Sequence, residues 1–183
     1  AGHASPIDLG RARVDTQLPR YFINALGIGF DAQAAAEALK IRRLHGFSVY
    51  IVAILRALRN YHAHPMTVEF GGERITRRLL FTSVANGRAQ AGGFFLTPEA
   101  SVDDGLLDLC LVDDLRLDEI ARYIPKVLRG KHTHLRQVRM GRAASVRISC
   151  SAPMPVATDG EVLAVDARRI HVEIVPQALD LLV

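Results

Sequence analysis

Polar and apolar residues alternate over most of the chain, a pattern typical of half-buried β-strands. The alternation covers residues 7–14 and, after a turn at 15–19, residues 20–30. It returns as a hairpin whose strands flank the Gly-Gly-Glu turn at 71–73, with the pattern at 66–70 and 74–87. The remaining predicted strands are residues 106–112, 136–142, 145–150, 155–160, 161–167, 169–175 and 178–183.

Three segments between these strands have helical periodicity. Residues 31–40 are rich in Ala and Leu, which are strong helix formers, and Asp31 stands where an N-cap is expected. In residues 46–61 apolar side chains recur at helical spacing, so this stripe is expected to face the core. Residues 116–132 form the third predicted helix, with a kink or a break at Pro125 because proline lacks the amide hydrogen.

Together these elements predict a strand-rich α+β domain with helices inserted between the strands. Two antiparallel sheets packed face to face, a β-sandwich, are the natural way to bury so many alternating strands. The chain has 183 residues, of which 49% are hydrophobic and 23% charged, so we expect one domain with a substantial core over residues 1–183.

The cysteines and the hydropathy indicate the compartment. Cys110 and Cys150 lie in apolar runs without CxxC spacing, so buried free thiols in a reducing compartment are expected. No apolar run approaches the roughly 18 residues that cross a bilayer, and residues 1–10 lack the apolar stretch of a signal peptide. The expected location is therefore the cytoplasm.

Positive charge is concentrated in one part of a chain whose net charge is +4. No acidic residue lies between Glu119 and Asp159. The cations of this span are Arg122, Lys126, Arg129, Lys131, Arg136, Arg139, Arg142 and Arg147, with His132 and His134. Such a block can attract phosphates, anionic lipid headgroups or nucleic acid, although a solvated basic face explains it equally well. Nucleic acid is the least favoured because Tyr123 is the only aromatic residue of the block that could stack on bases.

Two stretches rich in Gly and Asp are typical of loops, and loops of this kind can also contribute to a functional site. Residues 86–94, NGRAQAGGF, place a glycine pair after a strand and fit neither the dinucleotide fingerprint nor the P-loop. Residues 98–109, PEASVDDGLLDL, favour a turn. They could also hold a hard cation such as Mg²⁺ through one carboxylate, two loop carbonyls and water molecules.

A third stretch, TDGEVL at residues 158–163, places Asp-Gly between two predicted strands. This pair is the strongest short signal for a type I′ hairpin. Glu161 lies close to Asp159 and begins a strand, where an acid is disfavoured. Two close carboxylates raise the pKa of one of them, which prepares a proton acceptor for an attacking hydroxyl. The tip is therefore either an ordinary turn or a catalytic base.

In this order and at these spacings, the stretches resemble the C-terminal half of the bacterial diacylglycerol kinase and lipid kinase family, which is related to sphingosine kinases. The resemblance covers almost the whole chain and includes IDLG at 7–10, RYFINALGIGFDA at 20–32, GFSVYIVAILRAL at 46–58, residues 86–112 and TDGE. It implies a two-domain enzyme of the NAD kinase-like superfamily. An N-terminal domain with a GGDGT-type motif would bind ATP, and a C-terminal β-sandwich would supply the lipid site and the base.

Carried over by position, the resemblance implies a role for each of five residues. Asp159 would be the proton acceptor and Glu161 an acid that supports it. Asp104 would be the side-chain ligand of a structural Mg²⁺, and Ser101 and Leu106 would give it backbone carbonyls. Replacement of Asp159 by Asn is thus expected to lower turnover by orders of magnitude with little loss of stability.

The resemblance also implies what lies outside the chain. No GGDGT motif occurs in residues 1–183, so an ATP-binding domain is expected to precede them, and the chain alone is expected to be inactive. The expected partners are that domain, a diacylglycerol-like or sphingosine-like lipid acceptor, and an anionic membrane on the inner face. The sequence leaves the acceptor lipid and the oligomeric state open, with a homodimer among the options.

One position departs from the family pattern, and two other functions remain as alternatives. Ala91 stands where the family usually has the first of three glycines, and alanine tolerates most backbone conformations except those with positive φ. The departure concerns the shape of the loop and the lipid preference. The alternatives are a kinase of the same fold that acts on a soluble acceptor such as NAD, and a non-catalytic β-sandwich that binds lipid or anionic membranes.

Overall fold

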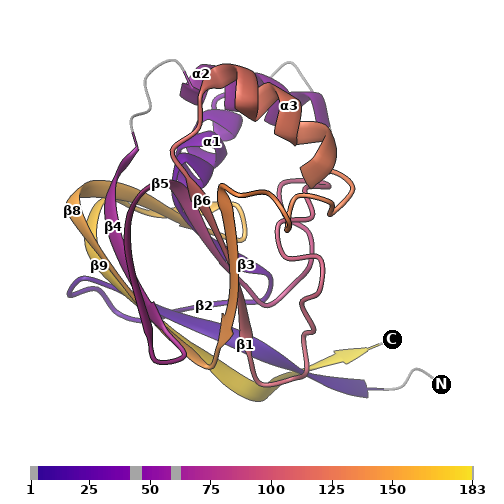
Figure 1. Cartoon of the computed structure of the whole chain (residues 1–183). Coiled ribbons are helices and arrows are strands. Elements are labelled where there is room, and N and C mark those ends of the chain that lie inside the picture. The colour runs from indigo at the N-terminus through magenta and orange to yellow at the C-terminus, as the bar shows by residue number, and fades with distance from the viewer. Residues whose placement is uncertain (1–3, 42–46, 59–62, 183) are drawn as a thin grey trace.

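The described residues form a strand-rich domain whose three helices gather at one end (Figure 1). The computed structural model describes residues 4–41, 47–58 and 63–182. The strands are β1 (Ala4–Val14), β2 (Arg20–Phe22), β3 (Ala25–Gly29), β4 (His64–Phe70), β5 (Glu73–Ala85), β6 (Leu107–Asp113), β7 (Val138–Ala143), β8 (Ser145–Thr158) and β9 (Glu161–Leu182). The helices are α1 (Phe30–Leu39), α2 (Phe47–Leu58) and α3 (Leu117–Val127).

The strands pair antiparallel in the order β2-β1-β9-β8-β3-β5-β6-β7, and β4 pairs with both β5 and β8. Residues 146–150 of β8 pair with β4, whereas residues 156–158 pair with β3. β5 is divided in the same way, since residues 73–79 pair with β4 and residues 81–85 with β3. The predicted strand-rich α+β class is confirmed. The two layers of the sandwich are joined through β5 and β8, which take part in both.

Two hydrophobic clusters fill the domain. The larger lies between the layers and includes Leu26, Met66 and Ile148. The smaller lies between the helices and the sheet, and it joins Phe30 of α1 to Leu80, Cys110 and Ile120. It therefore fixes the helices against the outer face of β5 and β6.

Both cysteines are free and buried, as predicted. Burial raises the pKa of Cys110 to about 12 and that of Cys150 to about 11. A thiol with such a pKa stays protonated near neutral pH and is a poor nucleophile. Both residues therefore act as small apolar side chains.

Several predicted strands merge. Residues 145–150 and 155–160 belong largely to the single strand β8, and the three strands predicted after residue 160 form β9, which has 22 residues. The pairing of β8 with β9 shifts register between Ser149 and Met154 and again near Val156. Such irregularities interrupt the alternation without ending the strand, which is why the sequence suggested separate strands.

The helices differ from prediction at two points. α3 contains Pro125 and continues to Val127, so the proline does not break the helix but stands in its last turn. α1 begins at Phe30, and its N-cap is Gly29, which has a φ of 85° and makes no side-chain cap hydrogen bond. Asp31 therefore lies inside the first turn, and its assignment as N-cap is wrong. Within the described segments, no helix is long and apolar enough to span a bilayer.

Candidate active site

The tip of the β8–β9 hairpin is the two-residue turn Asp159–Gly160. Both residues have positive φ, 46° and 88°, as a type I′ turn requires. Thr158 and Glu161 are paired directly opposite each other across the turn. The predicted hairpin is confirmed, and the contacts of the Asp159 side chain decide what else the turn does.

The carboxylate of Asp159 is bound by the main chain between β2 and β3. Its Oδ2 accepts a hydrogen bond from the amide N–H of Ile23 at 2.8 Å. Its Oδ1 accepts hydrogen bonds from the amide N–H groups of Asn24 and Ala25, at 3.1 and 2.9 Å. Hydrogen bonds to a charged acceptor are stronger than neutral ones, so these contacts hold the carboxylate and the segment together. An asparagine would point an NH₂ group at these donors, which gives Asp159→Asn a stability cost that the sequence did not predict.

Asp159 lines a cavity of about 440 Å³. The other lining residues are Ile23, Asn24, Ala25, Gly27, Asp31, Ala35, Tyr50, Gln90, Ala91, Ala157 and Gly160. Glu161 is exposed and is not part of this wall. The structure therefore places one of the two predicted carboxylates in the cavity, and the supporting role of Glu161 stays a prediction.

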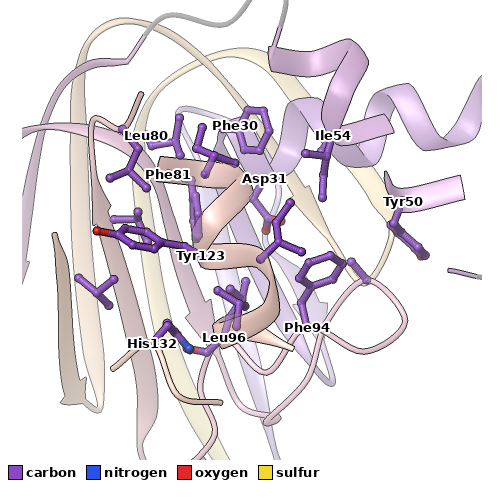
Figure 2. A pocket seen from close by; sticks show the side chains of 18 of the residues that line it. Phe30, Asp31, Tyr50, Ile54, Leu80, Phe81, Phe94, Leu96, Tyr123 and His132 are labelled. Carbon is purple, nitrogen blue, oxygen red and sulfur yellow. The ribbon is translucent and has the colours of Figure 1, made fainter. Parts of the chain in front are cut away.

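A second, apolar cavity of about 130 Å³ adjoins the first (Figure 2). Asp31, Ala35, Tyr50 and Ala91 line both cavities, so the two spaces adjoin each other at these residues. The remaining wall comes from all three helices and from the sheet: Phe30, Ala34, Ile54, Leu80, Phe81, Phe94, Leu96, Val112, Leu115, Ile120, Tyr123, Ile124, Val127, His132, Leu135 and Val138. A hydrocarbon chain could be buried here while its polar end reaches the cavity of Asp159.

Asp31 is a functional candidate that sequence reasoning missed. Its side chain extends from the first turn of α1 over β3, and a Cβ at Gly27 would lie 2.0 Å from its Oδ2. Only glycine at position 27 therefore leaves room for this carboxylate. Burial raises the pKa of Asp31 to about 6. The acid that the sequence assigned to helix capping stands instead at the junction of the two cavities.

His132 is a buried polar side chain in the wall of the apolar cavity, and the sequence did not single it out. It is 1% exposed, and its Nε2 lies 3.1 Å from the carbonyl oxygen of Leu96. A carbonyl only accepts hydrogen bonds, so Nε2 carries the proton and Nδ1 is a bare acceptor. Nδ1 has no hydrogen-bond partner among the described residues. Burial lowers the pKa of His132, so the ring is neutral near pH 7.

The loop of residues 86–93 closes the same end of the cavities. Gln90 donates a hydrogen bond from Nε2 to Oγ of Ser83 at 2.6 Å, which fixes the loop to β5. Ala91 has a φ of 49°, the conformation that its methyl group disfavours. The alanine that replaces the first of the family's three glycines is therefore a strained residue, and it lines both cavities. A Cβ at Gly92 would lie 3.2 Å from the ring of Tyr50, so this loop also packs closely on α2.

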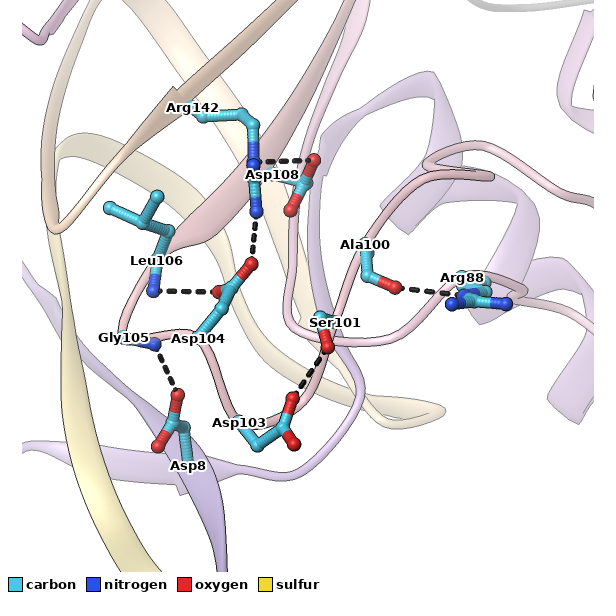
Figure 3. Close-up of polar contacts among 10 residues, drawn as sticks. All are labelled: Asp8, Arg88, Ala100, Ser101, Asp103, Asp104, Gly105, Leu106, Asp108 and Arg142. Atoms are coloured by element: carbon cyan, nitrogen blue, oxygen red, sulfur yellow. Dashed lines mark hydrogen bonds and ion pairs between the residues drawn. The ribbon is translucent and has the colours of Figure 1, made fainter.

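The residues predicted to bind Mg²⁺ lie in the loop before β6 (Figure 3). Oδ1 of Asp104 accepts a hydrogen bond from the amide N–H of Leu106 at 3.1 Å, and Oδ2 forms an ion pair with Arg142. The hydroxyl of Ser101 donates to Asp103 at 2.5 Å. Asp104 is thus the charged centre of this loop, and both of its oxygens are already engaged.

The donor set is of the right chemical type for Mg²⁺. One carboxylate, two main-chain carbonyls and water molecules are hard oxygen ligands, which Mg²⁺ prefers. In the described ranges, no group of three or more His, Cys, Asp or Glu side chains is placed to hold a metal ion, but this set requires only one. Close by, Arg142 also pairs with Asp108 at 3.3 Å, and Oδ2 of Asp108 is buried without a hydrogen-bond partner. A cation at Asp104 would have to share a carboxylate oxygen either with the amide of Leu106 (Oδ1) or with Arg142 (Oδ2).

Hydrogen bonds connect this acidic loop to the hairpin tip. Gly105 donates its amide N–H to Oδ2 of Asp8 at 2.7 Å. The Asn86 side chain donates to the main-chain oxygens of Asp8 and Ile23, at 2.9 and 3.0 Å. Ile23 in turn donates its amide N–H to Asp159. Asn86 is fully buried, so it is a positioning residue between the two predicted sites. The sequence marked its loop but not this role.

Comparison with known proteins adds the family. The family described as "YegS C-terminal NAD kinase beta sandwich-like domain" matches residues 24–183. The diacylglycerol kinase of Mycobacterium tuberculosis is 30% identical over 161 residues, which cover 87% of this chain and 52% of that protein. A protein of Xanthomonas euvesicatoria named "Probable lipid kinase YegS-like" is 29% identical over 180 residues, which cover 96% of this chain and 57% of that protein.

A solved structure supports the fold. The crystal structure of a diacylglycerol kinase from Bacillus anthracis has a TM-score of 0.64 and 19% sequence identity, and the match covers 97% of this chain and 53% of that one. At this identity the likeness concerns the fold alone. The chain spans about half the length of the relatives that it matches.

Proposed function

This chain belongs to the family of YegS C-terminal NAD kinase β-sandwich-like domains, and on that premise we propose that it is the acceptor-binding part of an ATP-dependent lipid kinase. Such an enzyme transfers the γ-phosphate of ATP to a lipid hydroxyl. The relatives named as diacylglycerol and lipid kinases support this proposal. ATP would bind to a separate N-terminal domain, and the chain alone would be inactive.

The adjacency of the two cavities carries the proposal. One cavity has an almost wholly apolar wall, and the other contains the carboxylate of Asp159. This combination suits a molecule with a hydrocarbon chain and a hydroxyl better than it suits a dinucleotide, whose phosphates and sugars need many polar partners. The geometry therefore favours a lipid acceptor over NAD.

Asp159 would act as the general base. As the acceptor oxygen attacks the γ-phosphorus, the O–P bond forms, the bond between the γ-phosphorus and the β,γ-bridging oxygen breaks, and ADP leaves. The hydroxyl proton passes to the carboxylate of Asp159. Three main-chain donors hold this carboxylate in place, so its orientation is fixed before the acceptor binds. Glu161, on the exposed side of the turn, would support the negative charge of the site from outside the cavity.

The loop of Asp104 would hold a structural Mg²⁺. Asp104 would give a carboxylate oxygen, and Ser101 and Leu106 would give carbonyl oxygens. The ion would fix the loop, and through the hydrogen bonds of Asp8 and Asn86 this loop supports the segment that binds Asp159. Its role would be positional.

Part of the basic block would contact an anionic membrane. Arg139 and Arg142 form ion pairs with Glu73 and Asp104, so their charges are partly neutralised. The exposed cations outside the recorded ion pairs at the end of α3 are Lys126, Arg129 and Lys131. At about 1 kcal/mol per charge, changing these three to Gln should weaken binding of the intact protein to phosphatidylserine vesicles roughly 100-fold. Unchanged binding, or an equal loss for Arg13, Arg20 and Arg169 changed to Gln, would disprove this contact.

The function is tested with the intact protein, ATP-binding domain included. Phosphate transfer from ATP is measured in parallel with diacylglycerol, a sphingosine-like base and NAD as acceptors. We expect transfer to a lipid, and a loss of about 10²–10⁴-fold in kcat for Asp159→Asn, which is the usual contribution of a general base. The matched control is Asp166→Asn, which removes an exposed carboxylate from the same hairpin.

The outcomes separate the alternatives. Transfer to NAD alone would show a kinase with a soluble acceptor. Lipid binding without transfer to any acceptor would show a non-catalytic module. Full activity of Asp159→Asn would disprove the base assignment and leave the lipid acceptor untouched.

A further inference from the structure

The outer face of strands β1, β9, β8 and β4 contains a hollow that the reaction described above does not use. Its volume is about 480 Å³. The residues that line it are Arg13, Asp15, Glu69, Arg147, Ile148, Ser149, Arg169, Ile170 and His171. The three arginines are exposed, and the residues next to them, Val14, Val146 and Ile170, are buried in the core. Because side chains alternate along a strand, all three arginines point away from the core.

Strand pairing gathers these arginines around His171. Arg13 on β1 and Arg147 on β8 are the direct cross-strand partners of His171, one on each side of β9. Arg169 lies two residues before His171 on β9, and therefore on the same face. Adjacent strands are about 4.8 Å apart, so the long side chains from three neighbouring strands can meet over one point.

The charges of the three arginines are not neutralised within the described part of the chain, where none of them forms an ion pair. The wall also contains two acids. Glu69 pairs with Arg74 at 3.5 Å, and Asp15 accepts hydrogen bonds from the main-chain N–H groups of Arg168 and Arg169. Three arginines against the one acid without an ion pair leave the hollow with a formal charge of +2. Like charges on adjacent strands repel one another, so a bound anion would relieve this repulsion.

The geometry of arginine selects the type of anion. A guanidinium group is a rigid fork whose parallel N–H donors match two oxygens of a phosphate. A phosphomonoester has three free oxygens and a charge close to −2 at neutral pH. It therefore balances the charge of the hollow and offers an oxygen to each arginine. A phosphodiester has one charge and two free oxygens, and it matches the hollow less well.

The place of the hollow in the fold separates it from the proposed membrane contact. β4 runs from the helices toward its turn with β5, and Glu69 is the next-to-last residue of β4 (Figure 1). The hollow therefore lies at the end of the sandwich away from α3, whose cations are proposed to face the membrane. A ligand in solution can reach it there.

We propose that this arginine hollow binds a soluble phosphomonoester through Arg13, Arg147 and Arg169. The inference is separate from the lipid kinase function, because neither Asp159 nor the two cavities beside it take part.

Binding is tested by NMR with the intact protein, in about 0.15 M salt to screen diffuse attraction. Inorganic phosphate and dimethyl phosphate, a diester with one charge, are titrated while the backbone amide resonances around His171 are followed. These resonances report the arginine hollow alone, even where phosphate also binds to the ATP-binding domain. We expect saturable shifts with inorganic phosphate and at least about 10-fold weaker binding of dimethyl phosphate.

Variants of the arginines test which groups hold the phosphate. Arg147→Gln should weaken binding about 10-fold, since it removes hydrogen bonds to a charged group. Arg147→Lys keeps the charge but lacks the fork, so its affinity should lie between those of Arg147→Gln and the wild type. Changing Arg13, Arg147 and Arg169 together to Gln should abolish saturation. If that triple variant does not fold, Arg147→Gln alone gives the test.

The matched control changes Arg20, Arg56 and Arg136 together to Gln, which removes the same charge from exposed positions elsewhere. This control should keep the wild-type affinity for phosphate. A parallel measurement uses phosphatidylcholine vesicles that contain phosphatidic acid, whose headgroup is a phosphomonoester. The triple variant of the arginine hollow should sediment with these vesicles as the wild type does.

Four results would overturn the proposal. Absence of a saturable shift around His171, equal affinity for dimethyl phosphate, or an equal loss in the control would show only the diffuse attraction of anions to a basic face. Loss of vesicle binding in the triple variant would show that the ligand is a lipid headgroup and not a soluble phosphomonoester.

Discussion

Asp31→Asn should stabilise the ligand-free protein, although it changes a residue of the proposed site. The ordinary pKa of 3.8 rises to about 6 in the folded chain. A difference of about two pKa units, at about 1.4 kcal/mol each, corresponds to about 3 kcal/mol. This is a cost of folding, because the folded state disfavours the ionised carboxylate.

The sign of the pH dependence follows from the same shift. Below about pH 3 the carboxyl group is protonated in both the folded and the unfolded chain, so folding removes no charge from water. Between about pH 4 and 6 the unfolded chain releases its proton first, and the cost develops. Above about pH 6 the cost is complete. The advantage of Asn over Asp should therefore be only about 0.5 kcal/mol at pH 4 and reach about 3 kcal/mol by pH 8.

Equilibrium urea unfolding at several pH values between 4 and 8 measures this advantage. Circular dichroism is the suitable signal because the chain contains no Trp. In thermal unfolding at neutral pH, the midpoint temperature of Asp31→Asn should be roughly 6–12 °C above that of the wild type, since about 1 kcal/mol corresponds to about 2–4 °C for a chain of this size. Ionisation of His132 affects both proteins and cancels in the difference. The exposed control Asp166→Asn should give a flat profile near zero. An Asp31→Asn advantage that is absent at pH 8, or the same at pH 4 and 8, would refute the conclusion that the fold disfavours the ionised form of Asp31.

Three further outcomes are expected. Ala91→Gly should raise the free energy of unfolding by about 1 kcal/mol, because it removes the strain of a positive φ at this residue. The greater entropy of glycine in the unfolded chain offsets only part of that gain. An unchanged urea midpoint would show that Ala91 is not strained. Mg²⁺ should raise the melting temperature of the wild type but not of Asp104→Asn, and an equal rise in both would place the ion elsewhere. The ring resonances of His132 should show no protonation in NMR spectra between pH 7 and 8, since burial lowers its pKa; an imidazolium signal at pH 7 would contradict the bare Nδ1 acceptor.

The architecture could be predicted because alternation reports directly which face of a strand is buried. The strand pattern gave the α+β class, and the Asp-Gly pair gave the type I′ turn that the φ angles of Asp159 and Gly160 confirm. Alternation does not say which strands pair, however. The division of β5 and β8 between β3 and β4 depends on contacts between segments far apart in the chain, and no local pattern encodes it.

The site was predicted only in part, because some of its residues are indicated by local sequence and others depend on contacts with other segments. Asp159 and Asp104 stand in turns, where local sequence is informative. Asp31 was misread because an acid before an Ala-rich run is the usual form of an N-cap. Its true setting depends on Gly27, which lies four residues earlier on β3 and leaves space for its carboxylate. The spacing of that glycine from the acid is the one signal in the sequence that could have suggested it.

The choice of Asp over Asn at position 159 distinguishes a turn from a site. Asn-Gly forms a type I′ turn as well as Asp-Gly does, so the turn alone does not require a carboxylate. The three main-chain donors of residues 23–25 do require one, because two acceptor oxygens receive them. This gives a purely structural reason for Asp159 and predicts a loss of about 1–2 kcal/mol for Asp159→Asn. The activity of Asp159→Asn distinguishes the structural reason from the catalytic one. If the carboxylate only orders its neighbours, the activity of the variant falls in proportion to its folded fraction. If the carboxylate is the general base, activity falls by orders of magnitude even when the variant is fully folded.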